Sequence, residues 1–381
     1  MNARQRLLLT LNGEIPDRVP VSLFVQEEFL SYMYPGKMVD RVTDAVECAK
    51  YFEFDIMTRS KKFEYPHFMK KSFPNWQLDC KTIRKSGNIY KMYEITTPLK
   101  TLKQVEVGPD VGDRSSGLHL STQEYMIKDE SDLEAFIKYV PSIDQETISE
   151  MNHYCSWSKK QIGDLGISVP WTWGGIYNQA ATYREATELM MDPYINLEFY
   201  GRYMTKLTEL SCEYSAALAR ANGDAIGIQG NIANSAVLGK DFFDKFVLPY
   251  EKTLVDAIHQ EGSFTIYHNC GKAEVLQGSY VDMGMTAWET IAAHPQGDND
   301  LERAKKNVGQ QLTLIGNLDQ ISFLKTASEP ELEAKVEQMV SIGKPGGRYI
   351  FACSDFLEVD TPHKNIKAIV KAAKHYGKYN F

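Results

Sequence analysis

Residues 263–290, SFTIYHNCGKAEVLQGSYVDMGMTAWET, contain two short apolar runs separated by a segment with helical periodicity. The runs at 264–268 and 285–289 are predicted as buried strands, and residues 272–283 as the helix that connects them. A helix between two buried strands indicates a crossover connection, which joins parallel strands of one sheet. This stretch therefore predicts an α/β fold built on a parallel sheet.

The same alternation of strands and helices extends over most of the chain. The predicted parallel strands cover residues 19–24, 165–171, 225–229, 264–268, 285–289, 312–316 and 349–353. There is room between them for an eighth strand. No glycine-rich phosphate loop follows the first strand, so a closed barrel fits the length of 381 residues better than an open sheet. We therefore predict a (β/α)8 TIM barrel.

One segment departs from this alternation. Between residues 56 and 110 the pattern changes to short alternating runs, such as residues 88–95, which indicate strands and hairpins. We predict that residues 1–381 form a single barrel domain, in which residues 56–110 are a β-rich insertion near the barrel mouth.

The composition is that of an ordinary globular protein, with 43% hydrophobic and 24% charged residues. A net charge of -8 without a long basic run argues against nucleic-acid binding. No stretch approaches the roughly 20 apolar residues that a membrane helix needs. The six cysteines are scattered, which favours free thiols or metal ligands over disulfides. We expect a cytoplasmic protein that binds neither nucleic acid nor membranes.

The sharpest local feature, His268-Asn269-Cys270-Gly271, begins where the predicted strand at 264–268 ends. Residues two apart at a strand end project in the same direction, so His268 and Cys270 could hold one ion at the C-terminal face of the barrel. Cys353, at the end of another predicted strand, is a candidate third ligand. One imidazole and two thiolates suit zinc and leave one tetrahedral position open, as in catalytic sites. A buried cysteine is also often a plain core residue, so spacing alone leaves both roles open.

Several segments resemble a known family. Residues 12–21, NGEIPDRVPV, are similar to the opening of the uroporphyrinogen decarboxylase superfamily. His268-Asn269-Cys270-Gly271 with the distant Cys353 resembles the zinc motif of its corrinoid and methylcobamide methyltransferase branch. Residues 314–319, LIGNLD, and 361–366, TPHKNI, are also similar to segments of that superfamily. The resemblance implies a TIM barrel that binds zinc and works with a corrinoid-binding protein and a small-molecule methyl donor or acceptor.

Glu289 lies at the end of the strand predicted at 285–289. The resemblance implies that it is a catalytic residue, a carboxylate that fills the open zinc position until substrate arrives. An ordinary hydrogen-bonding acid at the barrel mouth is the alternative. Asp355 and Asp319 also follow predicted strands. We expect them to orient His268 by hydrogen bonding, without binding the metal themselves.

Aromatic side chains are frequent near the predicted mouth. They suit a flat apolar pocket for an aromatic substrate or for the edge of the corrin, although packing of the barrel rim would use the same residues. The candidate substrate-binding residues are Phe24, Tyr65, Trp171, Trp173, Tyr177 and Trp288.

Two directions of methyl transfer fit such a zinc site. Zinc could polarise the oxygen of a methoxylated aromatic while the cobalt(I) of a corrinoid protein takes the methyl group, or it could hold a thiol that accepts the methyl group from the corrinoid. We favour the first, an O-demethylation, because aromatic residues are abundant and no cationic clamp for a small anionic thiol is evident. A decarboxylase-like lyase ranks lower, because residues 22–28 contain Glu27 and Glu28 but no arginine to bind a polycarboxylate. A non-catalytic, zinc-stabilised barrel ranks last, because structural zinc normally has four protein ligands.

Overall fold

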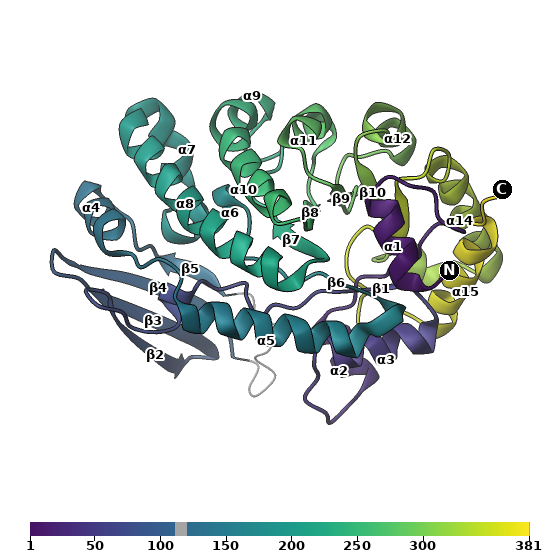
Figure 1. Cartoon of the computed structure of the whole chain (residues 1–381), viewed down its shortest axis with the longest axis horizontal. Coiled ribbons are helices and arrows are strands. Elements are labelled where there is room, and N and C mark those ends of the chain that lie inside the picture. The colour runs from purple at the N-terminus through teal and green to yellow at the C-terminus, as the bar shows by residue number, and fades with distance from the viewer. Residues whose placement is uncertain (111–119, 381) are drawn as a thin grey trace.

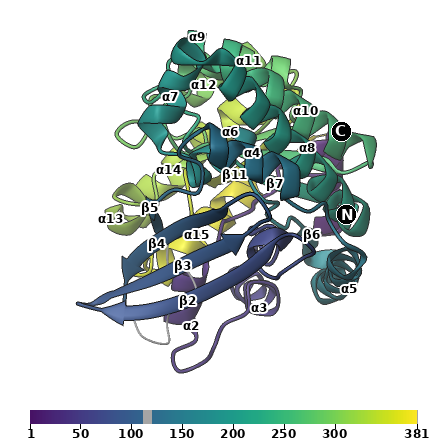
Figure 2. The ribbon, with the colours of Figure 1, turned by 90° about the vertical axis from the view of Figure 1, so that its left-hand side faces the viewer.

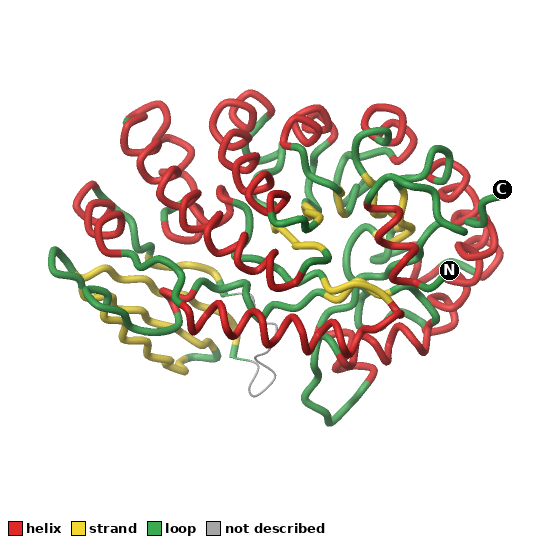
Figure 3. Tube along the Cα trace, in the orientation of Figure 1, coloured by secondary structure: helices red, strands yellow, loops and turns green. Residues whose placement is uncertain are grey.

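Parallel strands occupy the centre of the structure, and helices surround them (Figure 1, Figure 3). The computed structural model describes residues 1–110 and 120–380. Five parallel strands form the main sheet, in the order β11-β10-β9-β8-β7. They are β7 (Ala225–Gln229), β8 (Phe264–His268), β9 (Ala287–Glu289), β10 (Thr313–Leu318) and β11 (Tyr349–Cys353).

Two further strands extend this sheet beyond β7. β1 (Ile56–Thr58) pairs in parallel with β6 (Gly166–Ser168). Just after β6, Trp171 forms a parallel bridge with Gly227 of β7. The β1-β6 pair therefore lies beside the main sheet, next to β7.

The segment around Val21 closes the ring. Val21 forms a parallel bridge with Phe351 of β11 on one side. On the other side its carbonyl accepts a hydrogen bond of 2.7 Å from the backbone nitrogen of Asp55, next to β1. The segments therefore follow one another in a ring from Val21 through β1, β6 and β7–β11 and back, which confirms the predicted TIM barrel.

The eighth strand is β1, which the sequence prediction included in the β-rich segment. With three residues, all buried, it is too short to show the alternation or the apolar run that identifies a strand.

Helices cover the outside of the ring (Figure 3). Their bounds are α1 Ala3–Leu11, α2 Glu27–Met33, α3 Thr43–Phe52, α4 Glu130–Tyr139, α5 Gln145–Ile162, α6 Ile176–Tyr183, α7 Ala186–Ile195, α8 Leu197–Asn222, α9 Lys240–Phe242, α10 Leu248–Gln260, α11 Gln277–Met283, α12 Leu301–Val308, α13 Phe323–Thr326, α14 Glu329–Gly343 and α15 His363–Tyr376. In the described part of the chain, none of these helices combines the length and the apolar content needed to cross a bilayer.

Side chains alternate between two hydrophobic cores along each strand. A small core fills the barrel with residues such as Ile266, Ala287 and Ile350, and α1 contributes Leu7 and Leu11 to it. A larger core lies between the strands and the helices. The residue number within a strand therefore decides whether a side chain faces the barrel interior or the helices.

The predicted β-rich segment is a four-stranded antiparallel sheet inserted between β1 and β6. Its strands are β2 (Gln77–Lys85), β3 (Asn88–Thr96), β4 (Thr101–Pro109) and β5 (Ser121–Glu124). The sheet thus begins at Gln77, later than the predicted boundary of residue 56. Figure 1 shows it at one end of the molecule, and Figure 2 views it from that end with the barrel helices behind it.

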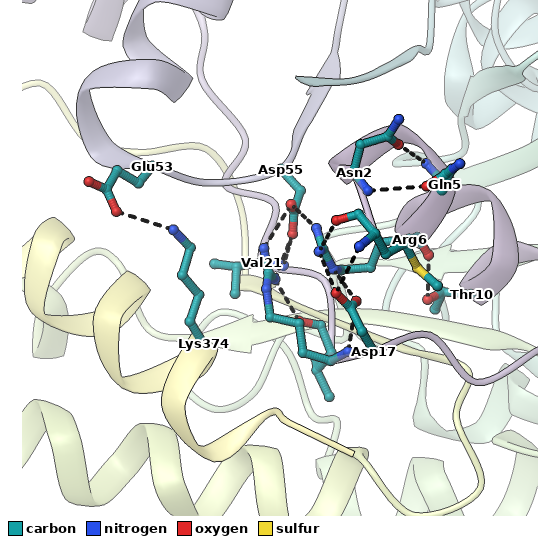
Figure 4. Close-up of polar contacts among 12 residues, drawn as sticks. Asn2, Gln5, Arg6, Thr10, Asp17, Val21, Glu53, Asp55 and Lys374 are labelled. Atoms are coloured by element: carbon teal, nitrogen blue, oxygen red, sulfur yellow. Dashed lines mark hydrogen bonds and ion pairs between the residues drawn. The ribbon is translucent and has the colours of Figure 1, made fainter. Parts of the chain in front are cut away.

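A buried charge cluster joins the N-terminal segment to β1 (Figure 4). The carboxylate of Asp55 accepts hydrogen bonds from Nη1 of Arg6 at 2.8 Å, from both terminal nitrogens of Arg18 at 2.8 and 2.9 Å, and from the backbone nitrogen of Val21 at 2.9 Å. The Asp55 side chain is 3% exposed. Val21 and Asp55 also form the backbone contact that closes the ring. Asp55 therefore stabilises the barrel at the point where an isolated bridge replaces a regular strand.

We predict that Asp55→Asn lowers the free energy of unfolding by about 3–5 kcal/mol, because it leaves two largely buried guanidinium groups without their carboxylate. Arg18 loses the carboxylate that it contacts with both terminal nitrogens, whereas Arg6 keeps its pair with Asp17. Chemical denaturation measures this change. The control is Lys374→Met, which removes an ion pair of 3.3 Å with the exposed Glu53 and should cost less than about 1 kcal/mol. Similar losses for the two variants would contradict a special role for Asp55 in closing the barrel.

Candidate metal centre and substrate cavity

His268 is the last residue of β8 and faces the barrel interior, since it lies two residues after Ile266. Its side chain is only 6% exposed. Nδ1 lies 3.0 Å from Oε2 of Glu289, the residue that pairs with His268 in register on β9. This contact fixes the imidazole plane and leaves Nε2 available for another partner.

Glu289 is held from its other side by Arg59, which follows β1. Oε1 of Glu289 accepts a hydrogen bond from Nη2 of Arg59, and both side chains are almost completely buried. Burial alone would raise the pKa of Glu289, but the charge of Arg59 and the hydrogen bond with His268 lower it to about 2. Glu289 is therefore an ionised carboxylate that orients His268.

Arg59 is a functional candidate that the sequence analysis missed. Its guanidinium carbon lies 5.5 Å from the centre of the Phe24 ring and 5.7 Å from that of Trp171. Among residues 1–110 and 120–380, no hydrogen-bond partner reaches its buried Nε and Nη1. In the sequence, Arg59 directly follows β1 (Ile56–Thr58). This position points to the barrel mouth only if β1 is recognised as a barrel strand.

Three potential metal ligands meet on the Nε2 side of the His268 ring. Nε2 lies 3.9 Å from Oδ1 of Asp355. One ligand atom from each of His268, Cys270 and Asp355 lies within 4.8 Å of the others. Cys270 follows the end of β8, and Asp355 follows the end of β11. The cluster therefore sits at the C-terminal face of the barrel, where TIM-barrel enzymes carry their catalytic groups.

This donor set fits a zinc ion. Imidazole, thiolate and carboxylate are all common zinc ligands, with bond lengths of roughly 2.0–2.3 Å. Tetrahedral zinc with such bonds would separate its ligand atoms by roughly 3.3–3.8 Å, so a contraction of about 1 Å from the outer limit of the cluster is enough. Three protein ligands would leave the fourth position open for a substrate.

The two carboxylates occupy positions opposite to those expected from the sequence. We predicted Glu289 as a ligand and Asp355 as the orienting acid, but Glu289 contacts Nδ1 while Asp355 lies near Nε2. Direct ligation by Glu289 stays a prediction. Asp319, the other acid expected to orient His268, instead accepts hydrogen bonds from the backbone of Ile321 and Ser322.

Cys353 lies outside the compact cluster. Ile350 and Ala352 of β11 face the barrel interior, so the alternation directs Cys353 toward the helices, where it belongs to the larger core. Its thiol is buried, and burial raises its pKa. Ligation by Cys353, two residues before Asp355, stays a prediction that requires the end of β11 to turn.

A cavity of about 740 Å³ reaches β7, the strand next to the one that carries His268. Its barrel side is formed by residues at or beyond the C-terminal ends of four consecutive segments of the ring, which are Glu27, Lys61, Trp173 and Gln229. Gln229 ends β7 and pairs in register with His268 of β8. Neighbouring strands are roughly 4.8 Å apart, so the cavity ends one strand away from His268, although His268, Cys270 and Asp355 do not line it.

The predicted substrate-binding aromatics fall into three groups. Tyr65 and Trp173 line the cavity. The ring centres of Phe24 and Trp171 lie 5.9 and 5.7 Å from that of His268.

Tyr177 and Trp288 pack in the larger core, as Trp173 does, but unlike Trp173 they do not line the cavity. Trp288 precedes Glu289 on β9, and because Glu289 faces the interior, the alternation turns Trp288 toward Tyr280, with ring centres 5.3 Å apart. This placement gives no support to substrate contact by Tyr177 or Trp288.

Comparisons with known proteins agree with this architecture. A family model described as uroporphyrinogen decarboxylase (URO-D) matches residues 166–376, more than half of the chain. A methylcobamide:CoM methyltransferase MtbA from Methanosarcina mazei is 26% identical over 168 residues, which cover 44% of this chain and 47% of that protein. A uroporphyrinogen decarboxylase from Geobacter metallireducens is 27% identical over 152 residues, covering 39% and 42%. The chain thus matches about half the length of these curated relatives.

A solved structure has the same fold along the whole chain. It is a methyltransferase from Methanosarcina mazei with a TM-score of 0.68 and 17% sequence identity, and the match covers 99% of both chains. At this identity the likeness shows the barrel fold alone.

We predict that the purified protein binds about one zinc ion per chain and that Cys270→Ala loses most of it, because two remaining ligands hold zinc poorly. Elemental analysis after dialysis measures the content. Asp355→Asn and Cys353→Ala, treated in the same way, separate the two candidates for the third ligand. Full zinc retention in Cys270→Ala would remove the cluster from consideration.

We also predict that Arg59→Met weakens zinc binding by about 10- to 100-fold, because Glu289 then loses the partner that fixes it against His268. Competition with a chromogenic chelator measures the affinity, and Arg59→Lys should restore part of it by returning the charge. Arg303→Met, which removes an ion pair with Glu274 on the surface, is the matched control. Equal zinc affinities for Arg59→Met and the control would show that Arg59 has no influence on the metal centre.

Proposed function

The chain belongs to the uroporphyrinogen decarboxylase (URO-D) family, and from this premise we propose that it transfers a methyl group from a methoxylated aromatic compound to the cobalt(I) of a corrinoid protein. The observation that carries the proposal is the cluster of His268, Cys270 and Asp355 at the barrel mouth. A large cavity lined by polar and aromatic side chains reaches β7, the strand next to the one that carries His268. Similarity to proteins named methylcobamide:CoM methyltransferase supports methyl chemistry with a corrinoid.

In this proposal His268 and Cys270 hold a zinc ion, and Asp355 or Cys353 supplies the third ligand. Zinc bound there supplies a Lewis acid for the ether oxygen, whose bond to the methyl carbon is otherwise hard to break. Glu289 keeps the His268 ring in place, and its predicted binding to the metal before substrate arrives would end when the donor takes that position. Arg59 keeps Glu289 ionised and fixed.

The cavity orients the donor. Tyr65, which is 43% exposed, offers a flat apolar surface to an aromatic ring, whereas Trp173 borders the cavity but is only 2% exposed. Gln229 lies at the side nearest His268. When the methyl group leaves, the electron pair of the carbon–oxygen bond stays on the aromatic oxygen, and cobalt provides the pair for the new bond to carbon. The corrinoid protein must therefore dock on the mouth of the barrel, where the methyl group is exposed.

Decarboxylation of a polycarboxylate remains a weaker proposal. Such a substrate needs cationic side chains that are free to bind it. Two buried arginines of the described residues are at least partly committed to acids, Arg41 to Glu27 at 2.8 Å and Arg59, through Nη2, to Glu289.

Methyl transfer from a corrinoid to a thiol is the second candidate, and the printed names of the MtbA relatives favour it. The same ligand set would serve it, because zinc also stabilises thiolates. The two candidates differ in direction and can be separated by experiment.

We predict that the zinc-loaded protein converts a cobalt(I) corrinoid protein to its methylated form when a methoxylated aromatic is supplied, with a corresponding change in the visible spectrum. Cys270→Ala should lower the rate at least about 100-fold, because the leaving oxygen loses its Lewis acid. Glu289→Gln should retain more activity, because it changes the orientation of His268 without removing a ligand.

Two results would decide against this reaction. A spectrum that does not change with any methoxylated aromatic, together with methyl transfer from the methylated corrinoid to a thiol, would establish the second candidate. Cys270→Ala with the rate of the unaltered protein would exclude the metal centre from either reaction.

A further inference from the structure

A second cavity lies on the outside of the barrel, between the end of α3 and the helix α15. Its volume is about 430 Å³, and it shares no lining residue with the cavity at the inserted sheet. Lys378, which lines it, forms an antiparallel bridge with Arg18 ahead of the first barrel segment, and Glu53 precedes β1. The cavity therefore lies toward the N-terminal ends of the strands, away from the mouth that carries His268.

One wall of this cavity is strongly basic. The helix α15 contains four lysines and no acidic residue, although the whole chain has a net charge of -8. Three of these lysines, Lys367, Lys371 and Lys374, line the cavity, and Lys378 lines it just beyond the end of the helix. Their spacing of three or four residues places the helical lysines on one face, over a length of about 10 Å. Their ammonium groups therefore approach the cavity from the same side.

Few acidic groups balance this charge. Among the described residues that line the cavity, only Glu53 is acidic, and it lies 3.3 Å from Lys374 (Figure 4). Within residues 1–110 and 120–380, no carboxylate lies within 4 Å of the amine of Lys367, Lys371 or Lys378. After Glu53 is matched with Lys374, three ammonium groups remain without an acidic partner.

Stabilisation of the helix explains only part of this arrangement. Lys374 and Lys378 flank the C-terminus of α15, where positive charge interacts favourably with the helix dipole. That effect falls off within the last turn, so it does not account for Lys367 or Lys371. Like charges four residues apart also destabilise a helix by a small amount. An anionic ligand would remove this repulsion.

The remainder of the cavity is apolar and aromatic. Phe52 and Val370 line it and are only 1% and 2% exposed, so they form its floor. Tyr51 lines the rim and is about half exposed, and its ring centre lies 4.0 Å from Nζ of Lys367. The cavity thus combines an apolar floor, one accessible aromatic ring and a row of ammonium groups.

From this combination we propose that the cavity binds the polyphosphate chain of a small molecule, with the phosphates along Lys367, Lys371 and Lys378. A volume of 430 Å³ is within the range of small-molecule sites. Phosphate oxygens accept charge-assisted hydrogen bonds from ammonium groups, and a chain of phosphates can reach several lysines of one row at once. A nucleotide would place its base against Tyr51, whereas an inorganic polyphosphate would leave that ring free. The site does not depend on the proposed methyl transfer.

Isothermal titration calorimetry on the full chain tests the proposal with ATP, AMP and inorganic triphosphate in a magnesium-free buffer. ATP should bind at least about 10-fold more tightly than AMP, because its additional phosphates reach further ammonium groups. Lys371→Met should weaken the binding of ATP by about 5- to 20-fold. Lys364→Met is the matched control, because it removes the same charge from the same helix at a position that does not line the cavity. It should change the affinity by less than about 2-fold.

The source of the phosphates follows from the same titrations. Tighter binding of ATP than of triphosphate assigns a nucleotide, and Tyr51→Ala should then remove the difference. Triphosphate that binds as tightly as ATP, or more tightly, assigns an inorganic polyphosphate.

Four results would overturn the proposal: no binding of ATP or triphosphate, equal affinities for ATP and AMP, equal losses in Lys371→Met and Lys364→Met, or tighter binding of a short DNA duplex than of either ligand. The last result would identify a nucleic-acid surface instead. Thermal unfolding of each variant checks that the helix is intact, and Lys371→Gln replaces Lys371→Met if that variant does not fold.

Discussion

The candidate site depends on the register between β8 and β9, which pairs His268 with Glu289. In a strand, a shift by one residue turns every side chain to the opposite face. Such a shift would place Tyr267 or Trp288 in the barrel and remove the polar pair from its centre. The buried neighbours on both faces, Ile266 inside and Tyr267 outside, make that shift costly. The packing of the two cores therefore determines the register that places His268 and Glu289 in the barrel interior.

The buried chain from Arg59 through Glu289 to His268 is stable only as a complete unit. An isolated charge in the barrel would be strongly unfavourable, and each of these groups satisfies the next. As a result, Nδ1 of His268 is bound to Glu289, which orients the ring, and Nε2 faces Cys270 and Asp355. This arrangement holds the imidazole rigidly, with Nε2 directed toward the other two candidate ligands.

The barrel and the pair His268 and Cys270 could be predicted from the sequence because both follow from local periodicity. Strands alternate with helices, and residues two apart at a strand end project together. Arg59 could not be predicted, because the strand before it, β1, has only three residues and is too short to show a hydrophobic pattern. The same alternation, applied to Ile350 and Ala352, would have directed Cys353 away from the interior. Asp355 lies beyond the strand, where the path of the chain depends on tertiary packing.

The central claim is that the mouth of this barrel holds a catalytic metal on His268 and Cys270. Anomalous X-ray diffraction from zinc-soaked crystals, collected on both sides of the zinc absorption edge, tests it most directly. The account predicts one strong peak roughly 2.0–2.3 Å from Nε2 of His268 and from Sγ of Cys270, with a third protein ligand from the segment after β11 and one position open toward the cavity. A peak elsewhere, or an ion enclosed by four protein ligands, would contradict it.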